Sequence, residues 1–305
     1  MRIGITYLYT IFKYGYPHTV DDAIRSLSEI QELGFHYVEL EGLGRENLIA
    51  VHARRKELRS VLDGCGLHVH NFCVVDPDMV HVDAAVRQPA LDRFRLGAEI
   101  AEVLEAETLH LASYAPPVEY LQTAPYQLSE GGSYRFEDVT RLRLPQGFCW
   151  DAVWNALVES AGFCADVAAE YGRTVLMEPR VGEVICSVDS LRRLIEHAGR
   201  PNLKANFDTG HFSAQRENVV LALAKLEGHF ANVHVADNHP ANAEHIPIGD
   251  GSIDWREFLS TLKRTGYDGY LGLDLGLSDQ LLDGYRRSVE HLLSIAAELN
   301  IGIEV

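Results

Sequence analysis

Short apolar runs alternate with longer amphipathic segments along the whole chain. Most runs are bounded by Gly and are rich in β-branched residues or Leu. Their apolarity is continuous rather than alternating, which is typical of parallel strands covered on both faces. The pattern predicts eight strands: Ile3–Tyr7, Tyr37–Leu40, Leu67–Val75, Thr108–Ala112, Thr174–Met177, Leu203–Phe207, Ala231–Ala236 and Tyr270–Leu275.

Between these runs, apolar residues recur at spacings of three and four, as in helices with one buried face. The predicted helices are Val20–Leu33, Asn47–Leu62, Ala90–Leu104, Ala152–Tyr171, Ser190–Ala198, Val219–Leu226, Trp255–Leu262 and Leu281–Leu299. Gly34, Gly172 and Gly266 each stand just before a strand, where glycine commonly ends a helix. Eight strand–helix units predict an α/β fold, a closed (β/α)8 TIM barrel, since an open doubly wound sheet usually has fewer.

One connection is much longer than the others. Ser113–Cys149 follows the fourth predicted strand and is rich in Tyr, Pro and Gly. A loop of this length usually has a function, and a loop that follows a barrel strand lies at the C-terminal mouth. We expect residues 113–149 to lie over the mouth, against substrate, as a passive cover or as a dimerisation arm. No change in composition marks a second domain, so residues 1–305 are expected to form one barrel.

The chain is acidic, with 27 Lys and Arg against 44 Asp and Glu and a net charge of −17. Such a surface repels nucleic acids and anionic membranes, so neither is an expected partner. The 5 cysteines are widely spaced without a CxxC pair, which is typical of reduced thiols in the cytoplasm. The sequence shows neither a signal-peptide pattern nor the roughly 18 apolar residues of a membrane span, and we expect a cytoplasmic protein.

Each of the last four predicted strands ends in a side chain that can bind metal. These side chains are Glu178, Asp208, His234 and Asp274, about one strand–helix unit apart. Because the C-terminal ends of barrel strands meet at one mouth, all four can converge. Three carboxylates and an imidazole suit one divalent ion such as Mn²⁺, Mg²⁺, Co²⁺ or Zn²⁺. The lack of a thiolate argues against a closed structural zinc site.

Each of these residues has a simpler interpretation when it is taken alone. A carboxylate at a strand end often caps the following helix, as Asp208 could, and His234 could be a hydrogen-bonded core histidine. The combination favours a cation, because carboxylates buried together raise one another's pKa unless a positive charge compensates them.

Three segments resemble a known family: Met177–Pro179, Phe207–His211 and His234–Trp255. Along essentially its whole length, the chain is similar to the xylose isomerase-like barrel superfamily of sugar and sugar-phosphate isomerases and epimerases. The resemblance implies a TIM barrel whose last four strands supply a Glu, an Asp, a His and a Glu to one metal, at the four positions above. It also implies that His211 touches substrate.

The chain departs from the family pattern at the last ligand, which is normally Glu and here is Asp274. Asp is shorter by one methylene group. Three outcomes are open: the strand moves inward, a water completes the coordination, or Asp274 serves as a base without tight metal contact.

The expected reaction is aldose–ketose isomerisation, or epimerisation next to a carbonyl, of a small carbohydrate. The metal would stabilise an enediolate, while Glu178 and Asp274 remove and return the proton from opposite sides. Arg180 could contact a hydroxyl or a phosphate, or form a surface ion pair; Trp150 and Tyr114 could stack on a sugar or only pack the loop. The candidates for substrate contact are His211, Glu183, His70, His110, Arg180, His245 and Trp150.

Other functions are also open. The same acid/base pair could eliminate water or a β-substituent, as in a lyase acting on a keto-sugar, a keto-inositol or an oxidised glycoside; a product of unchanged mass would exclude this. A sugar-binding barrel without catalysis, and a homo-oligomer, are compatible with the sequence. A DNA-repair branch of the superfamily uses a His-rich zinc cluster, which His70, His110, His211, His234 and His245 could imitate. That branch has an Asp where this chain has Ala243, and the net charge of −17 is unfavourable for binding DNA.

Overall fold

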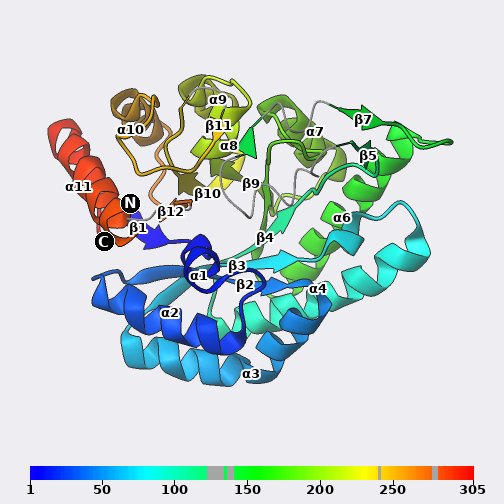
Figure 1. Cartoon of the computed structure of the whole chain (residues 1–305), viewed down its shortest axis with the longest axis horizontal. Coiled ribbons are helices and arrows are strands. Elements are labelled where there is room, and N and C mark those ends of the chain that lie inside the picture. The colour runs from blue at the N-terminus through cyan, green and yellow to red at the C-terminus, as the bar shows by residue number, and fades with distance from the viewer. Residues whose placement is uncertain (122–133, 136–140, 240–241, 277–280) are drawn as a thin grey trace.

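Eight parallel strands close into a barrel at the centre of the molecule (Figure 1). The computed structural model describes residues 1–121, 134–135, 141–239, 242–276 and 281–305. The strands in order around the barrel are β1 (Arg2–Ile5), β12 (Tyr270–Leu273), β10 (Phe230–Val235), β9 (Leu203–Asp208), β8 (Thr174–Glu178), β4 (Thr108–Ala112), β3 (His68–Val75) and β2 (Tyr37–Leu43). β1 pairs with both β12 and β2, which closes the sheet and confirms the predicted TIM barrel.

Helices surround this barrel (Figure 1). Those that the sequence predicts are α2 (Val20–Glu32), α3 (Gly44–Cys65), α4 (Ala84–Leu104), α6 (Trp150–Glu170), α7 (Val188–Ala198), α9 (Val219–Lys225), α10 (Trp255–Arg264) and α11 (Leu281–Leu299). Three further short elements were not predicted from the sequence: α1 (Leu8–Tyr14), the 3-10 turn η1 (Pro77–Val80) and α8 (Thr209–Ala214). In the part of the chain that the structure describes, no helix is both long and apolar enough to cross a membrane.

Helices end close to the three glycines at which the sequence predicts helix ends. Gly34, Gly172 and Gly266 all have positive φ, a conformation that glycine adopts without a steric penalty. Because each βα unit then returns to the same end of the barrel, the polar C-terminal ends of the strands share one mouth. α1 follows β1 directly, and its side chains Leu8, Ile11 and Phe12 line the pocket at this mouth.

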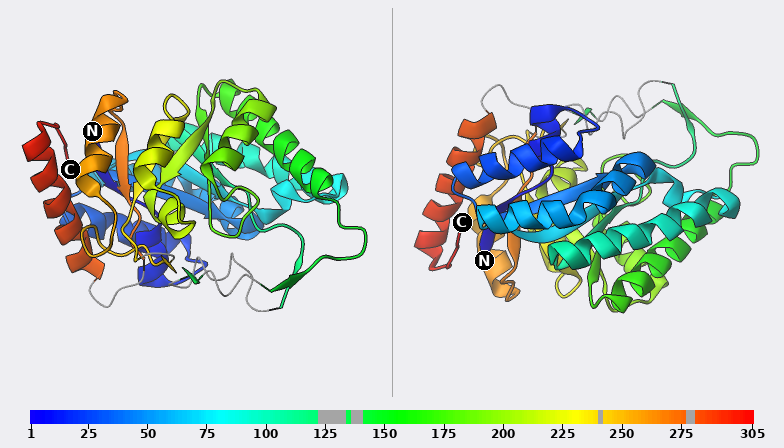
Figure 2. Two further views of the ribbon diagram at one scale, coloured as in Figure 1. Left: turned by 90° about the horizontal axis from the view of Figure 1, so that it is seen from above. Right: turned by 90° about the horizontal axis from the view of Figure 1, so that it is seen from below.

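The segment after β4 contains three short strands within the described residues. β5 (Glu119–Tyr120) pairs antiparallel with β7 (Leu142–Arg143), and this ribbon lies at the periphery of the molecule (Figure 2). β6 (Tyr134–Arg135) pairs with β11 (Asn242–Ala243), which follows β10 at the mouth. The backbone of β6 therefore reaches the mouth, while residues 122–133 and 136–140 of the predicted cover lie outside the described residues.

Helix α4 packs very closely on strand β3 at a glycine. Gly97 lies in the middle of α4, and a Cβ atom there would meet Cγ2 of Val74 far inside van der Waals contact. Val74 is fully buried, so it has little room to move. Glycine at this position is required by packing rather than by backbone conformation, because its φ is not positive.

We predict that Gly97→Ala destabilises the barrel by about 1–3 kcal/mol, the usual cost of overpacking a core. The matched control is Gly64→Ala in α3, where a new Cβ would have no neighbour within 4 Å. That control gains helix propensity, so its stability should stay the same or rise by up to about 1 kcal/mol. Denaturant unfolding of both variants measures the difference; equal stabilities would show that the α4–β3 contact is not tight.

Candidate metal centre and active site

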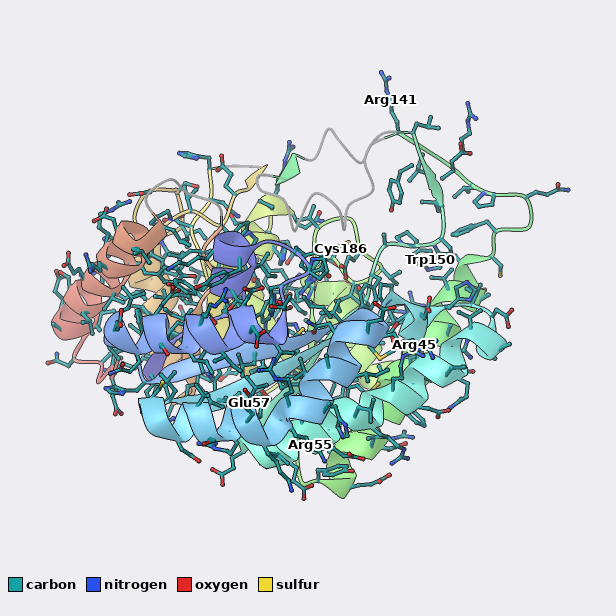
Figure 3. The ribbon with its side chains drawn as sticks, turned by 60° about the horizontal axis from the view of Figure 1, so that its bottom comes forward. Arg45, Arg55, Glu57, Arg141, Trp150 and Cys186 are labelled. Carbon is teal, nitrogen blue, oxygen red and sulfur yellow. The ribbon has the colours of Figure 1, made fainter. Side chains whose placement is uncertain are left out.

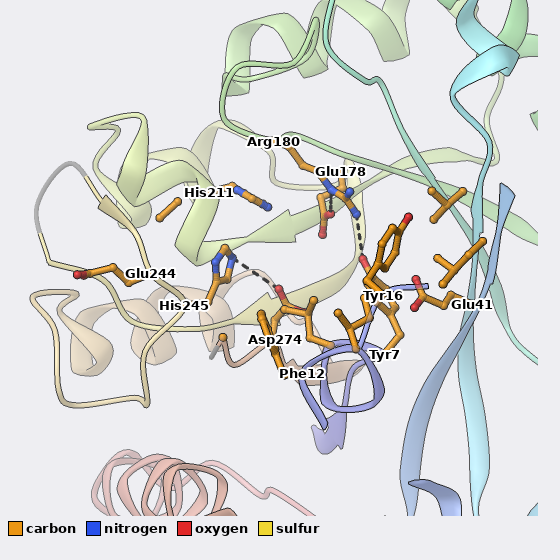
Figure 4. A pocket seen from close by; sticks show the side chains of 16 residues that line it. Tyr7, Phe12, Tyr16, Glu41, Glu178, Arg180, His211, Glu244, His245 and Asp274 are labelled. Atoms are coloured by element: carbon orange, nitrogen blue, oxygen red, sulfur yellow. Dashed lines mark hydrogen bonds and ion pairs between the residues drawn. The ribbon is translucent and has the colours of Figure 1, made fainter. Parts of the chain in front are cut away.

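The four side chains at the ends of the last strands converge at the mouth of the barrel. Figure 4 shows two of them, Glu178 and Asp274, in the pocket at this mouth. Nδ1 of His234 lies 2.9 Å from Oε1 of Glu178, 3.7 Å from Oδ2 of Asp208 and 3.9 Å from Oδ1 of Asp274. All four residues are buried, with at most 4% of their surface exposed. Side chains from β8, β9, β10 and the residue after β12 thus surround a single point.

The unpaired atoms at this point fit a divalent cation. Nδ1 of His234 and Oδ2 of Asp208 are buried, and among the described residues neither has a hydrogen-bond partner. An unpaired buried polar atom is costly, so such atoms usually face a ligand, a water or an ion. One ligand atom each from Glu178, Asp208 and His234 lie within 4.8 Å of one another. Two carboxylates and an imidazole are donors that Mn²⁺, Zn²⁺ and Co²⁺ accept.

Glu39, in strand β2, determines which nitrogen of His234 faces this point. Its two carboxylate oxygens each lie 3.0 Å from Nε2 of His234. Nε2 of the imidazole thus faces Glu39, and Nδ1 faces the mouth, where it would offer its lone pair to a bound metal. Burial opposes the charged form of His234, but Glu39 and then Asp274 outweigh it and hold the pKa of His234 well above its usual value. Burial opposes the charge of Glu39, but the charge and hydrogen bonds of His234 and His70 outweigh it and hold the pKa of Glu39 well below its usual value.

Glu39 was not predicted from the sequence as a residue of the site. A signal was present, because Glu39 is an acid between Val38 and Leu40 in an otherwise apolar run. Asn232 lies two residues before His234 in β10, on the same face of the strand. Its side chain also donates to Oε1 of Glu39 at 2.9 Å. A buried polar layer thus lies directly beneath the four convergent side chains.

Glu178 is held by donors on both of its oxygens. Nδ2 of Asn206 donates to Oε1 at 2.6 Å, and Nε of Arg180 donates to Oε2 at 2.6 Å. Arg180 also donates to the hydroxyl of Tyr7 at 3.0 Å. Burial alone would raise the pKa of Glu178, but Arg180 and then His110 reverse this and hold it well below its usual range. Of the two alternatives for Arg180, the ion pair is present, but it is buried rather than on the surface, because Arg180 is only 8% exposed.

Asp274 has a different environment from Glu178. The hydroxyl of Thr6 donates to its Oδ1 at 2.7 Å. Burial raises the pKa of Asp274 to about 6, although His234 and His245 oppose the rise. Nε2 of His245 lies 3.6 Å from Oδ2 of Asp274 and 3.7 Å from Oδ1 of Asp208. The shorter side chain at this position therefore has a second imidazole beside it.

The loop after β10 holds His245 in place. His245 has a φ of 50°, which is uncommon for a residue with a side chain. Oδ1 of Asn238 accepts hydrogen bonds from the backbone N–H groups of Glu244 and His245, both at 2.8 Å. The side chain of Asn238 in turn donates to the carbonyl of Gly210 at 2.6 Å. These bonds fix the His245 ring over α8.

His211 and Asp208 lie together at the start of α8. The His211 ring packs edge-on against His245, with centroids 4.8 Å apart. Burial lowers the pKa of His211 to about 4, so its ring is neutral near pH 7. Oδ1 of Asp208 accepts from the backbone N–H of His211 at 2.7 Å, so Asp208 does cap this helix. Its other oxygen remains for a cation.

Other candidates lie outside the pocket or behind it. Glu183 is buried, and its Oε2 accepts from Ser113 and from the Tyr114 backbone at 2.7 Å, so it fastens the start of the long segment. Tyr114 is buried and packs this segment. Trp150, the first residue of α6, is 43% exposed (Figure 3), and it is not among the described residues that line the mouth pocket.

Two further histidines lie deeper in the barrel. His70 donates or accepts at 2.9 Å with Oε1 of Glu39 and stacks on Tyr270, with ring centroids 4.3 Å apart. His110 lies beside the centre, with Nε2 3.5 Å from Oε2 of Glu178. Both are buried beneath the mouth pocket rather than lining it. They contact the acids that surround the centre.

Comparisons with known proteins bear on the family and the fold of the chain. The family model of the xylose isomerase-like TIM barrel matches residues 27–295. The L-ribulose-5-phosphate 3-epimerase of Salmonella heidelberg is 27% identical over 255 residues, covering 81% of this chain and 79% of that protein.

Two solved structures share the fold. A D-tagatose 3-epimerase-like protein superimposes with a TM-score of 0.73 at 20% identity, covering 98% of both chains. The 3-keto-D-glucoside 4-epimerase of E. coli superimposes with a TM-score of 0.71 at 19% identity, covering 96% of this chain and 99% of that one. The family resemblance expected from the sequence is thus confirmed.

We predict that Glu39→Gln weakens divalent-metal binding by roughly 10–100-fold, because an amide no longer favours the Nε2–H tautomer of His234. The matched control is Glu107→Gln: Glu107 also contacts an imidazole, His68, at 3.0 Å, but lies at the opposite end of the barrel strands. Calorimetric titration with Mn²⁺ measures both. Equal loss in the two variants would mean that Glu39 acts only through general stability.

Proposed function

Since the chain belongs to the xylose isomerase-like TIM barrel family, we propose that it is a divalent-metal-dependent epimerase of a small ketose or keto-sugar. One observation carries the proposal: the unpaired Nδ1 of His234 faces three buried carboxylates at the barrel mouth. The epimerase names of similar proteins support the same class of reaction.

In this proposal the metal is held by Glu178, Asp208 and His234, with Asp274 as a fourth ligand. The donor chemistry suits one divalent ion, as the unpaired nitrogen and oxygen atoms indicate. When bound, such an ion supplies positive charge that stabilises negative charge developing on the substrate's carbonyl oxygen. The hydrogen bonds of Glu39 with His234 and His70 beneath it keep the ligands oriented.

The two acid/base residues lie on either side of the centre. Glu178 ends β8 and Asp274 follows β12, and strands β9 and β10 stand between them in the barrel. Epimerisation removes a proton from one face of the carbon next to the carbonyl and returns one to the other face. Two carboxylates that flank the carbon perform both steps without moving the substrate.

Glu178 and Asp274 have different neighbours, which suits them to different roles. Arg180 and Asn206 keep Glu178 ionised, whereas burial raises the pKa of Asp274 to about 6. We infer that Glu178, fixed by Arg180 and Asn206, has the larger share in holding the metal, and that Asp274, which has one hydroxyl donor in Thr6, exchanges the proton more readily.

The proposed reaction is tested by incubating the metal-loaded protein with ketoses in D₂O. Epimerisation places deuterium on the carbon next to the carbonyl, and proton NMR detects this even where little epimer accumulates. The product has the mass of the substrate apart from the deuterium. Loss of water or of an aglycone would instead identify a lyase, and no exchange with any ketose or keto-sugar would contradict the proposal.

We predict that Asp274→Asn lowers the rate of deuterium exchange by roughly 10²–10⁴-fold, because an amide cannot take up the proton. The fold should persist, since the two side chains have nearly the same shape. Asp63→Asn, which removes an exposed carboxylate from α3, serves as the control and should exchange at the wild-type rate. Wild-type exchange and metal content in Asp274→Asn would show that Asp274 is a bystander.

The variant Asp274→Glu distinguishes the alternative explanations for an Asp at the position where the family normally has Glu. His245 lies beside Asp274, so an extra methylene group has to displace this imidazole or crowd the centre. We therefore expect Asp274→Glu to lose activity and to bind Mn²⁺ more weakly, measured by NMR exchange and calorimetry. Retained or increased activity would favour the alternative in which a water fills the gap.

A further inference from the structure

Two side chains lie together where the family normally has one glutamate. Asp274 stands at that position, and Nε2 of His245 lies 3.6 Å from its Oδ2 (dashed line in Figure 4). Both side chains line the pocket at the mouth. A glutamate is longer by one bond of about 1.5 Å, so its carboxylate could not extend toward this imidazole without colliding with it. His245 and a short acid at position 274 are therefore compatible, whereas His245 and a longer acid are not.

The ring of His245 fits closely against helix α8. A Cβ atom at Gly210 would lie 2.7 Å from Nε2 and 2.8 Å from Cδ2 of this ring. The φ of Gly210 is not positive, so glycine is required here by the space that the imidazole takes and not by backbone conformation. The ring of His211 packs edge-on against the same imidazole, with centroids 4.8 Å apart. The His245 ring thus has little room to turn toward α8.

The backbone of His245 is held by a second glycine and by an asparagine. The N–H group of Gly276 donates to the carbonyl oxygen of His245 at 2.6 Å, and a Cβ atom at Gly276 would lie 3.3 Å from Cβ of His245. Oδ1 of the fully buried Asn238 accepts from the N–H group of His245 at 2.8 Å. These contacts hold His245 at its uncommon φ of 50°. The position of the imidazole is therefore fixed by the surrounding chain.

The ring nitrogen that faces Asp274 is buried and unpaired. Only 9% of His245 is exposed, and its Nε2 has no hydrogen-bond partner among the described residues. Such an atom is costly unless it gains a partner when the site works. Oδ1 of Asp208 also lies 3.7 Å away, but it already accepts from the backbone N–H of His211 at 2.7 Å. Oδ2 of Asp274 is the oxygen to which a small turn of either side chain brings Nε2 within hydrogen-bond distance.

We propose that His245 is a positioning residue for Asp274. Its ring fills the space that a longer acid would occupy, and its Nε2 orients Oδ2 of Asp274 for proton exchange. The inference rests on the proposed function, in which Asp274 exchanges the proton. Asp274 and His245 together then replace the single glutamate of the family. A change of one of them alone should impair the site, and a matched change of both should restore much of what is lost.

The first test is a double-mutant cycle with Asp274→Glu and His245→Ala. Deuterium exchange from D₂O is followed by NMR with a ketose that the Mn²⁺-loaded wild-type protein exchanges. Removing the ring from the Asp274→Glu variant should raise its exchange rate by at least about tenfold, because the longer acid then has room. A double variant that is no faster than Asp274→Glu would overturn the inference.

His52→Ala is the matched control for the loss of an imidazole. His52 lies in α3, where its Nε2 is 2.6 Å from Oε2 of Glu99. Combined with Asp274→Glu, this change should leave the low exchange rate as it is. If it restored the rate as well as His245→Ala does, the effect would not be specific to the ring beside Asp274, and the inference would be contradicted.

The orienting contact is tested in the chain that keeps Asp274. The side-chain amide of His245→Gln can still donate a hydrogen bond near the place of Nε2, whereas His245→Ala leaves no donor. We expect His245→Ala to lower kcat roughly tenfold with little change in KM, and His245→Gln to keep most of the wild-type kcat. Equal losses of kcat in the two variants would overturn the inference. So would a raised KM with unchanged kcat, because it would make His245 a substrate contact.

The number of bound ions tests the main alternative for His245. Ligand atoms of Asp208, His211 and His245 also lie within 4.8 Å of one another, as a second metal would require. Calorimetric titration of the wild-type protein with Mn²⁺ should give one ion per chain, and His245→Ala should not change that number. Two ions in the wild type and one in His245→Ala would assign His245 to a metal and overturn the inference.

Thermal unfolding of the metal-free variants separates this inference from the proposed function. Asp274→Glu should lower the unfolding midpoint by roughly 2–6 °C, because the extra methylene group overpacks the site. The double variant should lose less than the two single variants added together. Additive losses would contradict the pairing of His245 with Asp274, whatever the activity. A wild-type protein that exchanges no ketose or keto-sugar would instead contradict the proposed function.

Discussion

The hydrogen bonds between Glu39 and His234 are the constraint on which the rest of the site depends. A neutral imidazole has one donor and one acceptor nitrogen, and its partner decides which is which. Because Glu39 accepts a hydrogen bond from Nε2 inside the barrel, Nδ1 is the nitrogen that faces the mouth, toward Glu178, Asp208 and Asp274. Without Glu39 the same four strand ends would still converge, but without a defined ligand nitrogen among them.

The buried carboxylates at the barrel mouth would repel one another without positively charged or hydrogen-bonding neighbours. Glu39 lies below His234, and Glu178 is paired with Arg180 on the other side. Arg180 and His234 hold the pKa values of Glu178 and Glu39 well below their usual range, whereas burial raises the pKa of Asp274 to about 6. Perturbed carboxyls of this kind gather at functional sites. The departure from Glu at this position thus coincides with a distinct electrostatic environment.

Much of the fold could be predicted from the sequence, because apolar periodicity and helix-ending glycines are local signals. The eight strands and the convergence of Glu178, Asp208 and His234 follow from them. The short elements α1 and α8 follow their strands directly and were not predicted, since one or two turns give only a weak periodic signal. Glu39 was missed because its role depends on facing His234 across the barrel, which no spacing along the chain reveals. The buried pairing of Arg180 was missed for the same reason.

The segment around Asp237 shows how a motif can serve structure and function together. Asp237 pins the glycine-rich turn by its carboxylate, and the adjacent Asn238 fixes His245 over the centre. The resemblance alone singled out this stretch without saying what its residues do. In the structure, Asp237 anchors the turn, and Asn238 positions a histidine of the pocket.

The most direct test of the account is the position of a metal relative to His234. A crystal structure of the Mn²⁺-loaded protein, with the ion located by anomalous scattering, measures this. The account predicts one ion at the mouth, within about 2.0–2.4 Å of Nδ1 of His234 and of carboxylate oxygens of Glu178 and Asp208. An ion bound elsewhere, or a His234 ring turned so that Nε2 faces the mouth, would contradict it.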